Sequence, residues 1–277
     1  GSNGLWPIPL SVCVIRRLIF ILKRCKEEYC FTERNVNLST VVISQPMYFP
    51  WVGMLEQMRC ADIWVHLDDA QFSKGSFMNR VQVKSLEGVQ WMTVPLLNQK
   101  LGRALNETQL AGHNWQRKHL AALQHMYKDA PFASEMYALA QSVLDNEGMS
   151  LAALGELSME SLALYFDILP AKVIRASELD VLGKGWKRVL DICRLLGAKR
   201  YVTGHGARNY LDHNSFEVAG IRVEYLNYQC IEYSQLHGAF TPYVTGLDLV
   251  ANMGVSGREV VVPKPVFWRD FLDEGSC

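Results

Sequence analysis

Two neighbouring aspartates, Asp68 and Asp69, follow a short apolar run that ends at Leu67. A carboxylate pair at the end of a strand can hold a divalent cation beside a phosphate, act as a general base, or accept a hydrogen bond from a ribose hydroxyl. The alternative is a solvent-exposed turn in which an aspartate caps backbone N–H groups. We take Asp69 as a candidate catalytic residue.

Asn79 and Arg80 follow in a segment with strand character. An arginine in this position can bind a carboxylate or a phosphate through two parallel hydrogen bonds, whereas a surface salt bridge would contribute little. The sequence therefore makes Arg80, beside Asn79, a candidate for binding an anionic part of a substrate.

His237 and Gly204 are two further candidates. An imidazole titrates near neutral pH and can serve as a general base, although a lone histidine is more often structural. Gly204 follows a predicted strand and precedes a short helical stretch, where backbone N–H groups can approach an anion. The segment 203–207 matches neither a P-loop nor a dinucleotide fingerprint, and the chain has no catalytic-serine elbow, zinc-protease or kinase motif.

The elements that must position these residues alternate along the chain. A strand over 40–44, a helix over 52–60 and a strand over 62–67 form a βαβ unit, which predicts a parallel pair with an open loop at its carboxyl end. Further expected elements are strands over 77–84, 89–97, 171–176, 200–203 and 222–226, and helices over 115–127, 132–144, 151–169, 186–196 and 246–253. We predict an α/β fold: an open, mainly parallel sheet with flanking helices, a β-hairpin insertion and a helical middle segment.

Charge divides the chain into two parts. Its 277 residues include 28 basic and 28 acidic side chains, and 49% are apolar, which argues against broad nucleic-acid binding and against disorder. Residues 1–38 carry six basic and three acidic side chains, which leaves 22 basic and 25 acidic in residues 39–277. We predict a basic, amphipathic N-terminal extension over 1–38 and one α/β body over 39–277.

The extension contains an apolar run over 5–22 that Arg16 and Arg17 interrupt. The run is too short and too charged to span a bilayer, so it either packs on the body or contacts an anionic membrane surface. Seven scattered cysteines without a CxxC pair predict reduced thiols in a cytoplasmic protein, and no metal site. We expect a small-molecule substrate, and the sequence points to no particular cofactor.

Several sequence blocks resemble those of the WbqC-like family. They are SQPMYFPWVG over 44–53, LDDAQFSKGSFMNR over 67–80, TGHGARNYL over 203–211 and GLDLVANMG over 246–254. The likeness covers about residues 40–254 and leaves residues 1–39 outside. The chain departs from the family pattern at Gly75, at Phe77-Met78 and at Gly246-Leu247.

The resemblance implies a role in bacterial O-antigen and related polysaccharide biosynthesis. It implies a transferase that moves glycine or another aminoacyl group onto an amino sugar, with a nucleotide sugar and an activated amino acid as substrates. Asp69 or His237 would be the base, and Gln45 and Asn79 would donate to the oxyanion. The substrate-binding residues that it implies are Gln45, Tyr48, Trp51, Arg80, Gly204, Asp248 and Asn252.

Two alternatives stay open from the sequence. The segment 49–55 is similar to the phosphate-binding turn of nucleotidylyltransferases, although the pair of histidines of that turn is absent. A chain rich in aromatic residues can also be a non-catalytic binding protein of a glycan-assembly complex. In the transferase, Phe49 and Trp51 would either stack on a base or sugar ring or pack in the core. Only the enzymatic alternatives predict turnover.

Overall fold

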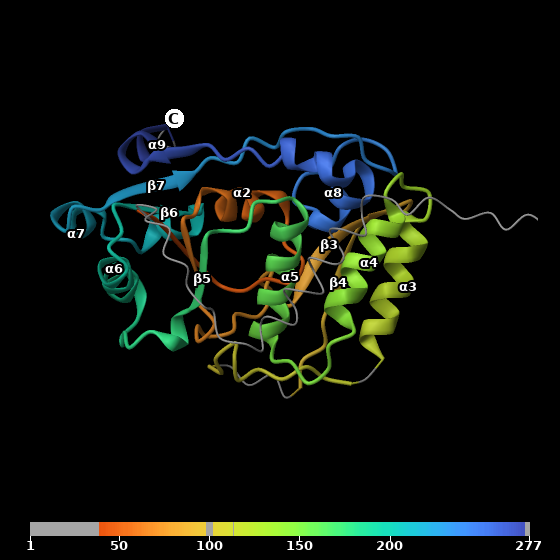
Figure 1. Cartoon of the computed structure of the whole chain (residues 1–277), viewed down its shortest axis with the longest axis horizontal. Helices are drawn as coiled ribbons and strands as arrows, with labels where there is room; N and C mark the ends of the chain where they lie inside the picture. The colour runs from red at the N-terminus through yellow and green to blue at the C-terminus, as the bar shows by residue number, and fades with distance from the viewer. Residues whose placement is uncertain (1–38, 98–101, 113, 275–277) are drawn as a thin grey trace, which may run out of the picture. The chain divides into compact units, whose positions relative to one another are not determined.

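A mostly parallel sheet is the larger of the two sheets in the computed structural model, which describes residues 39–97, 102–112 and 114–274 (Figure 1). Within these residues the sheet has six strands in the order β5-β2-β1-β6-β7-β8. Their bounds are β1 Thr40–Ser44, β2 Ile63–His66, β5 Lys172–Arg175, β6 Arg200–Thr203, β7 Arg222–Leu226 and β8 Pro265–Phe267. The first five are parallel, and only β8 pairs antiparallel.

The strand order reverses between β1 and β6. From β1 the chain proceeds through β2 to β5 on one side, and then from β6 to β7 on the other. In open α/β sheets, ligands bind outside the carboxyl ends of the strands near such a reversal. The topology therefore directs attention to the residues that follow β1, β2, β5, β6 and β7.

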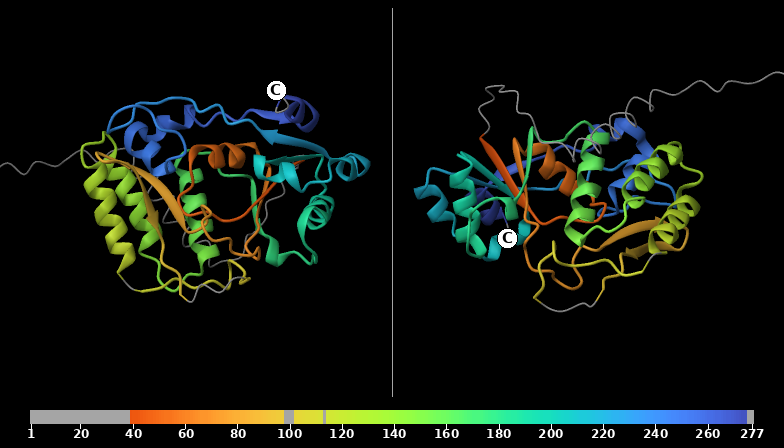
Figure 2. Two further views of the ribbon diagram at one scale, coloured as in Figure 1. Left: turned by 180° about the vertical axis from the view of Figure 1, so that it is seen from behind. Right: turned by 60° about the horizontal axis from the view of Figure 1, so that its bottom comes forward.

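Helices cover both faces of this sheet. Val41 and Ile43 of β1 pack in one buried cluster with α6 (Gly185–Leu195) and α7 (His213–Val218), while α2 (Val52–Cys60) contacts β1, β6 and β7 (Figure 2). Both faces being covered explains why β1 is an uninterrupted apolar, β-branched run and not an alternating one.

The helical middle and the hairpin form the rest of the body. The hairpin consists of β3 (Arg80–Ser85) and β4 (Gly88–Thr93), and Gly88 allows its tight turn with a φ of 104°. The other helices are α3 Trp115–Tyr127, α4 Ala133–Leu144, α5 Leu151–Tyr165 and α8 Gly246–Met253, with short 3₁₀ turns η1 Ala176–Glu178, η2 His205–Asn209 and η3 Gly254–Glu259. The predicted fold class is confirmed.

Three elements were not expected from the sequence. Helix α7 has six residues, β8 has three residues including Pro265, and α9 (Trp268–Glu274) follows β8 directly. Such short segments contain too few residues for a hydrophobic period to be visible, and β8 is an edge strand, where proline is tolerated. Residues 1–38, which contain the predicted extension, lie outside the described residues.

Candidate active site

A buried histidine holds a partly exposed glutamate at the carboxyl end of β2. Trp64 and His66 lie on one face of β2, and the Trp64 indole N–H donates to His66 Nδ1 at 3.1 Å. Because an indole nitrogen is only a donor, His66 must carry its proton on Nε2. Nε2 therefore donates to Glu160 Oε1, at 3.1 Å. His66 is 1% exposed, whereas the Glu160 side chain is 24% exposed, so the carboxylate remains open to solvent.

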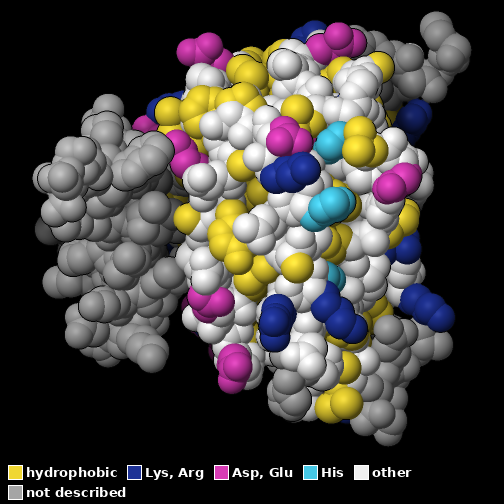
Figure 3. Space-filling model, turned by 90° about the vertical axis from the view of Figure 1, so that its right-hand side faces the viewer, with side chains coloured by type: hydrophobic (Ala, Val, Ile, Leu, Met, Phe, Trp, Pro, Cys, Tyr) yellow, Lys and Arg dark blue, Asp and Glu magenta, His cyan; other side chains and the backbone are white. Residues whose placement is uncertain are grey.

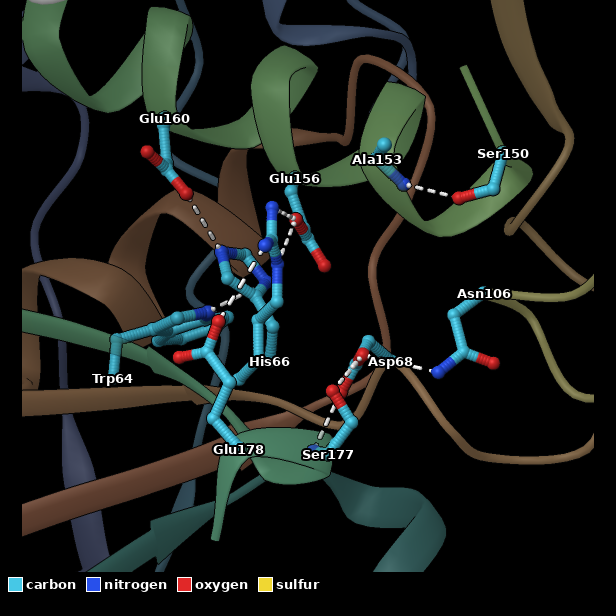
Figure 4. A network of polar contacts seen from close by, with 11 residues as sticks. Trp64, His66, Asp68, Asn106, Ser150, Ala153, Glu156, Glu160, Ser177 and Glu178 are labelled. Carbon is cyan, nitrogen blue, oxygen red and sulfur yellow. Dashed lines mark hydrogen bonds and ion pairs between the residues drawn. The ribbon is translucent and has the colours of Figure 1, made fainter. Parts of the chain in front are cut away.

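A second glutamate lies one helical turn away on α5. Glu156 and Glu160 are four residues apart and share a face of the helix. Burial raises the pKa of Glu156, and the hydrogen bond from Arg175 Nε, at 2.9 Å, opposes that shift. Arg175 ends β5 and is half exposed. We call His66, Glu156, Glu160 and Arg175 the carboxylate cluster (Figure 4).

Asp68 fixes the loop beneath this cluster. Its carboxylate accepts from the backbone N–H and the hydroxyl of Ser177, at 3.0 and 2.6 Å, and from the Asn106 amide at 3.3 Å (Figure 4). Asp68 is 2% exposed. Because Asp68 has three donors and little exposure, it holds the end of β2 against η1. Glu160 and Arg175 of the carboxylate cluster are more exposed to solvent than Asp68 is.

A glycine lets α5 approach the end of β1. A Cβ at Gly155 would come within 2.8 Å of Pro46 Cβ and 2.9 Å of the Met47 nitrogen. The Met47 N–H points to the sulfur of Met159 at 3.3 Å. Only a glycine permits this contact, which carries Glu156 and Glu160 to the carboxyl edge of the sheet.

Three residues predicted from the sequence lie along the same edge. Asp69 follows β2 and forms a two-bond ion pair with Arg188 of α6, at 2.8 and 2.6 Å. Gln45 follows β1 and is half-buried. Gly204 follows β6, and a Cβ there would lie 2.8 Å from Gln57 Nε2. The structure thus brings Asp69, Gln45 and Gly204 to the carboxyl edge, and their roles stay predictions.

Tyr48 and Phe49 are fully buried, whereas Trp51 is half-buried. The Tyr48 hydroxyl lies 2.9 Å from His119 Nδ1, and burial lowers the pKa of His119 to about 4. His119 is therefore neutral at neutral pH, and this contact fastens the loop after β1 to α3. Trp51 is the residue that precedes α2.

Asn79 precedes the hairpin and Arg80 begins it, on a different sheet from the one that carries His66 and Arg175. The buried Asn79 amide donates to the Val94 carbonyl at 2.9 Å. Arg80 donates to the Gly75 carbonyl, and its guanidinium lies 4.2 Å from the centre of the Trp91 ring. Both side chains thus contact the hairpin or its flanking loop, and their predicted roles stay predictions.

Asp248 lies in a saturated polar cluster at the start of α8. It accepts from the hydroxyls of Tyr127 and Tyr233, at 2.9 and 2.8 Å, and from the Asn252 amide at 3.2 Å. Asp248 is completely buried, and burial raises its pKa while these hydrogen bonds act in the opposite direction. We call these four residues the Asp248 cluster.

The remaining two candidates hold the loop beside this cluster. Asn252 Oδ1 accepts from the Leu236 N–H at 3.0 Å, and His237 Nε2 lies 2.7 Å from the Met126 carbonyl. The buried ammonium of Lys84 donates to Gln235 Oε1 at 3.0 Å and to the Gly238 carbonyl at 3.1 Å. The roles predicted for Asp248, Asn252 and His237 stay predictions.

Sequence reasoning missed all four members of the carboxylate cluster as functional candidates. Glu156 and Glu160 stand in an otherwise apolar helical segment, with the spacing that puts them on one face. Arg175 ends a short strand, and His66 precedes the aspartate pair. A systematic search for charged residues in apolar segments and at strand ends would have found them.

Possible metal ligands and the surface of the molecule also bear on the chemistry of the site. Among the described residues, no group of three or more histidine, cysteine, aspartate or glutamate side chains is placed to hold a metal ion. A groove of about 460 Å³ lies along α3 and α4, and its lining includes Gln116, Leu120 and Tyr137. Figure 3 shows this side of the molecule, where charges of both signs are interspersed with apolar side chains. No helix of the described residues is long and apolar enough to cross a membrane.

Comparison with known proteins identifies the family. The model of the WbqC-like protein family matches residues 45–260. A relative from Mycobacterium tuberculosis (strain ATCC 25618 / H37Rv), "Uncharacterized protein Rv1507c", is 30% identical over 225 residues, which cover 80% of this chain and 97% of the relative. No solved structure matches the chain. The chain belongs to the WbqC-like protein family.

Proposed function

We propose that the chain is a transferase of bacterial surface-polysaccharide (O-antigen) biosynthesis, which moves glycine or another aminoacyl group onto the amine of an amino sugar. The observation that carries the proposal is the pairing of His66 with Glu160. A carboxylate that a buried donor orients, and that solvent can still reach, has the properties of a general base.

The proposed reaction forms an amide. The amine nitrogen of the sugar attacks the carbonyl carbon of an activated acyl donor, such as a thioester, and the C–N bond forms. Glu160 accepts the proton that the amine loses. The leaving group departs with the electron pair of the broken C–S bond, as a thiolate. All atoms and electrons are then accounted for by the two substrates and Glu160.

The neighbours of Glu160 have supporting roles in this proposal. The N–H on Nε2 of His66 holds one carboxylate oxygen in place. Arg175 is half exposed beside Glu156 and can also hold the phosphate of a nucleotide sugar. Asp69, His237 and Asn79 remain proposed contributors, and Asp69, on the same edge, is the alternative base.

The test is amide formation detected by mass spectrometry with glycyl and alanyl thioesters and nucleotide-linked amino sugars. Because a general base contributes about 100- to 10,000-fold, Glu160→Gln should lower the rate by at least about 100-fold. Glu178→Gln is the control, since Glu178 is a 56% exposed glutamate beside the same cluster, where it contacts Arg175 at 3.5 Å. A Glu160→Gln rate equal to that of wild type would contradict the role of Glu160, and the same assay on Asp69→Asn tests the alternative base.

The two alternatives, a nucleotidylyltransferase and a non-catalytic glycan-binding protein, make different predictions. A nucleotidylyltransferase would bind phosphate at the first turn of α2, but the Trp51 ring lies there, so close that a Cβ on Gly53 would come within 2.1 Å of it. This geometry favours the acyl-transfer proposal. A non-catalytic glycan-binding protein would give no amide with any pair of substrates and would show binding only.

A further inference from the structure

Three aromatic side chains from separate segments meet beside the start of α2. Trp51 precedes the helix, Tyr228 follows β7, and Tyr243 precedes α8. The centres of their rings lie 4.8 Å apart for Trp51 and Tyr228, 5.1 Å for Trp51 and Tyr243, and 5.8 Å for the two tyrosines. We call these residues the aromatic trio. The rings are tilted against one another by 58 to 73°, so they pack edge to face.

The backbone holds the trio in a fixed arrangement. Gly53 has no side chain to displace the indole, because a Cβ there would lie 2.1 Å from a ring carbon of Trp51. Tyr243 has a φ of 66°, in the left-handed region that a bulky residue seldom adopts. Such strain persists only where the surrounding structure enforces it. The Tyr243 side chain is nevertheless 47% exposed, so burial of its ring does not explain the strain.

The trio lies at the carboxyl edge of the sheet. Tyr228 is the second residue after β7, while His66 and Arg175 of the carboxylate cluster end β2 and β5. The carboxyl ends of parallel strands share one edge of a sheet, so both groups of residues face the side on which ligands bind in this class of fold.

We propose that the aromatic trio is the stacking surface for the pyranose ring of the acceptor amino sugar. This inference rests on the proposed function and deepens it by assigning where the acceptor binds. One face of a pyranose ring presents aliphatic C–H groups, which pack on an aromatic ring, while its hydroxyls remain in water. A half-exposed surface of one tryptophan and two tyrosines offers these two environments side by side.

The experiment is isothermal titration of the full chain with D-glucosamine and with D-glucamine, an open-chain amino alditol. D-glucosamine should bind saturably, and D-glucamine at least about tenfold more weakly, because it has no ring to stack. Tyr243→Ala should weaken D-glucosamine binding by about tenfold, in the range that stacking on one aromatic ring supplies. Tyr210→Ala is the matched control and should leave binding unchanged, since Tyr210 is 49% exposed but lies outside the trio.

Tyr228→Ala is a second variant, which should weaken D-glucosamine binding in the same direction. The inference is overturned if wild type does not bind D-glucosamine, if both ligands bind equally, or if Tyr243→Ala binds as tightly as Tyr210→Ala. If D-glucosamine binding depends on Tyr243 but no amide forms, the proposed transferase function is wrong and the sugar-binding site stands. Amide formation that Tyr243→Ala does not weaken would keep the transferase function and remove this site.

Discussion

The carboxylate cluster and the Asp248 cluster both contain a carboxylate held by hydrogen-bond donors, but they differ in what remains available. Asp248 is completely buried and accepts from Tyr127, Tyr233 and Asn252. Glu160 accepts from His66 and is 24% exposed. A saturated, buried carboxylate has no capacity left for a substrate, whereas a partly exposed one can still accept a proton.

The two clusters join different elements of the fold. The Asp248 cluster joins α3, α8 and the loop after β7, and Lys84 of the hairpin binds the same loop. The carboxylate cluster joins β2, β5 and α5 at the edge where ligands bind. We therefore expect the first cluster to contribute mainly to stability, and the second cluster is where we propose the chemistry.

The largest expected effect comes from Asp248→Ala. The substitution leaves two tyrosine hydroxyls without their acceptor in a buried site, while the Asn252 amide keeps its bond to the backbone carbonyl of residue 248 at 2.8 Å. We expect the free energy of unfolding to fall by about 3–5 kcal/mol, as for other buried polar groups that lose a partner. Urea denaturation measures this loss. A loss below about 1 kcal/mol would mean that the cluster does not hold the fold.

Glu56 extends the comparison to a carboxyl group that is buried without a side-chain partner. It is completely buried on α2, and among the described residues only the backbone N–H of Val262 acts on it to favour the charged form. Burial raises its pKa from 4.5 to about 8. Between these values the folded protein keeps a proton that the unfolded chain has lost, so stability falls as pH rises.

Glu56→Gln should remove this dependence on pH. The free energy of unfolding of the variant, relative to wild type, should rise by about 2.5 kcal/mol between pH 5 and pH 7, since each pH unit contributes at most about 1.4 kcal/mol. Urea denaturation of both proteins at the two pH values gives the difference. A difference that does not change with pH would show that Glu56 is ionised in the folded state.

A smaller effect is expected from Trp64→Phe, which removes the donor to His66 Nδ1. Loss of this hydrogen bond should lower the free energy of unfolding by about 1–2 kcal/mol. The His66 proton should stay on Nε2, because Glu160 still accepts from it. Urea denaturation measures the loss, and a variant as stable as wild type would contradict the role of Trp64.

The smallest effect is expected from Asp69→Asn. Asp69 pairs with Arg188 through two hydrogen bonds, but its side chain is 26% exposed. Solvent screens such a pair, so the free energy of unfolding should fall by about 1 kcal/mol or less. Thermal denaturation measures this change. A loss as large as that of Asp248→Ala would place Asp69 among the residues that hold the fold.

The sequence predicted the fold better than the site. The apolar run of β1, helix α3 and the shorter helix α8 were predicted with the bounds that the structure has, because their patterns are local. The contact of His66 with Glu160 joins residues 94 positions apart, and the contact of Asp69 with Arg188 joins residues 119 apart. No local pattern reports which of the many charged residues become such partners.

Asp248 shows that local sequence patterns do not report distant partners even for a residue that the sequence did mark as a candidate. The motif around it indicated an important residue, and the structure shows how many donors surround it. Whether a polar residue is saturated depends on neighbours that the chain brings from α3 and from the loop after β7. The resemblance to a family therefore indicated that Asp248 is important. The donors around its carboxylate are known only from the way α3 and the loop after β7 pack against it.

The most direct test is the rate of amide formation per folded molecule, compared between Asp248→Asn and Glu160→Gln at a temperature where both variants are folded. Asp248→Asn should retain a rate close to that of wild type, because Asp248 holds the fold. Glu160→Gln should lose at least about 100-fold, because its amide cannot accept the proton. The opposite pattern, with the rate lost in Asp248→Asn and retained in Glu160→Gln, would contradict the account.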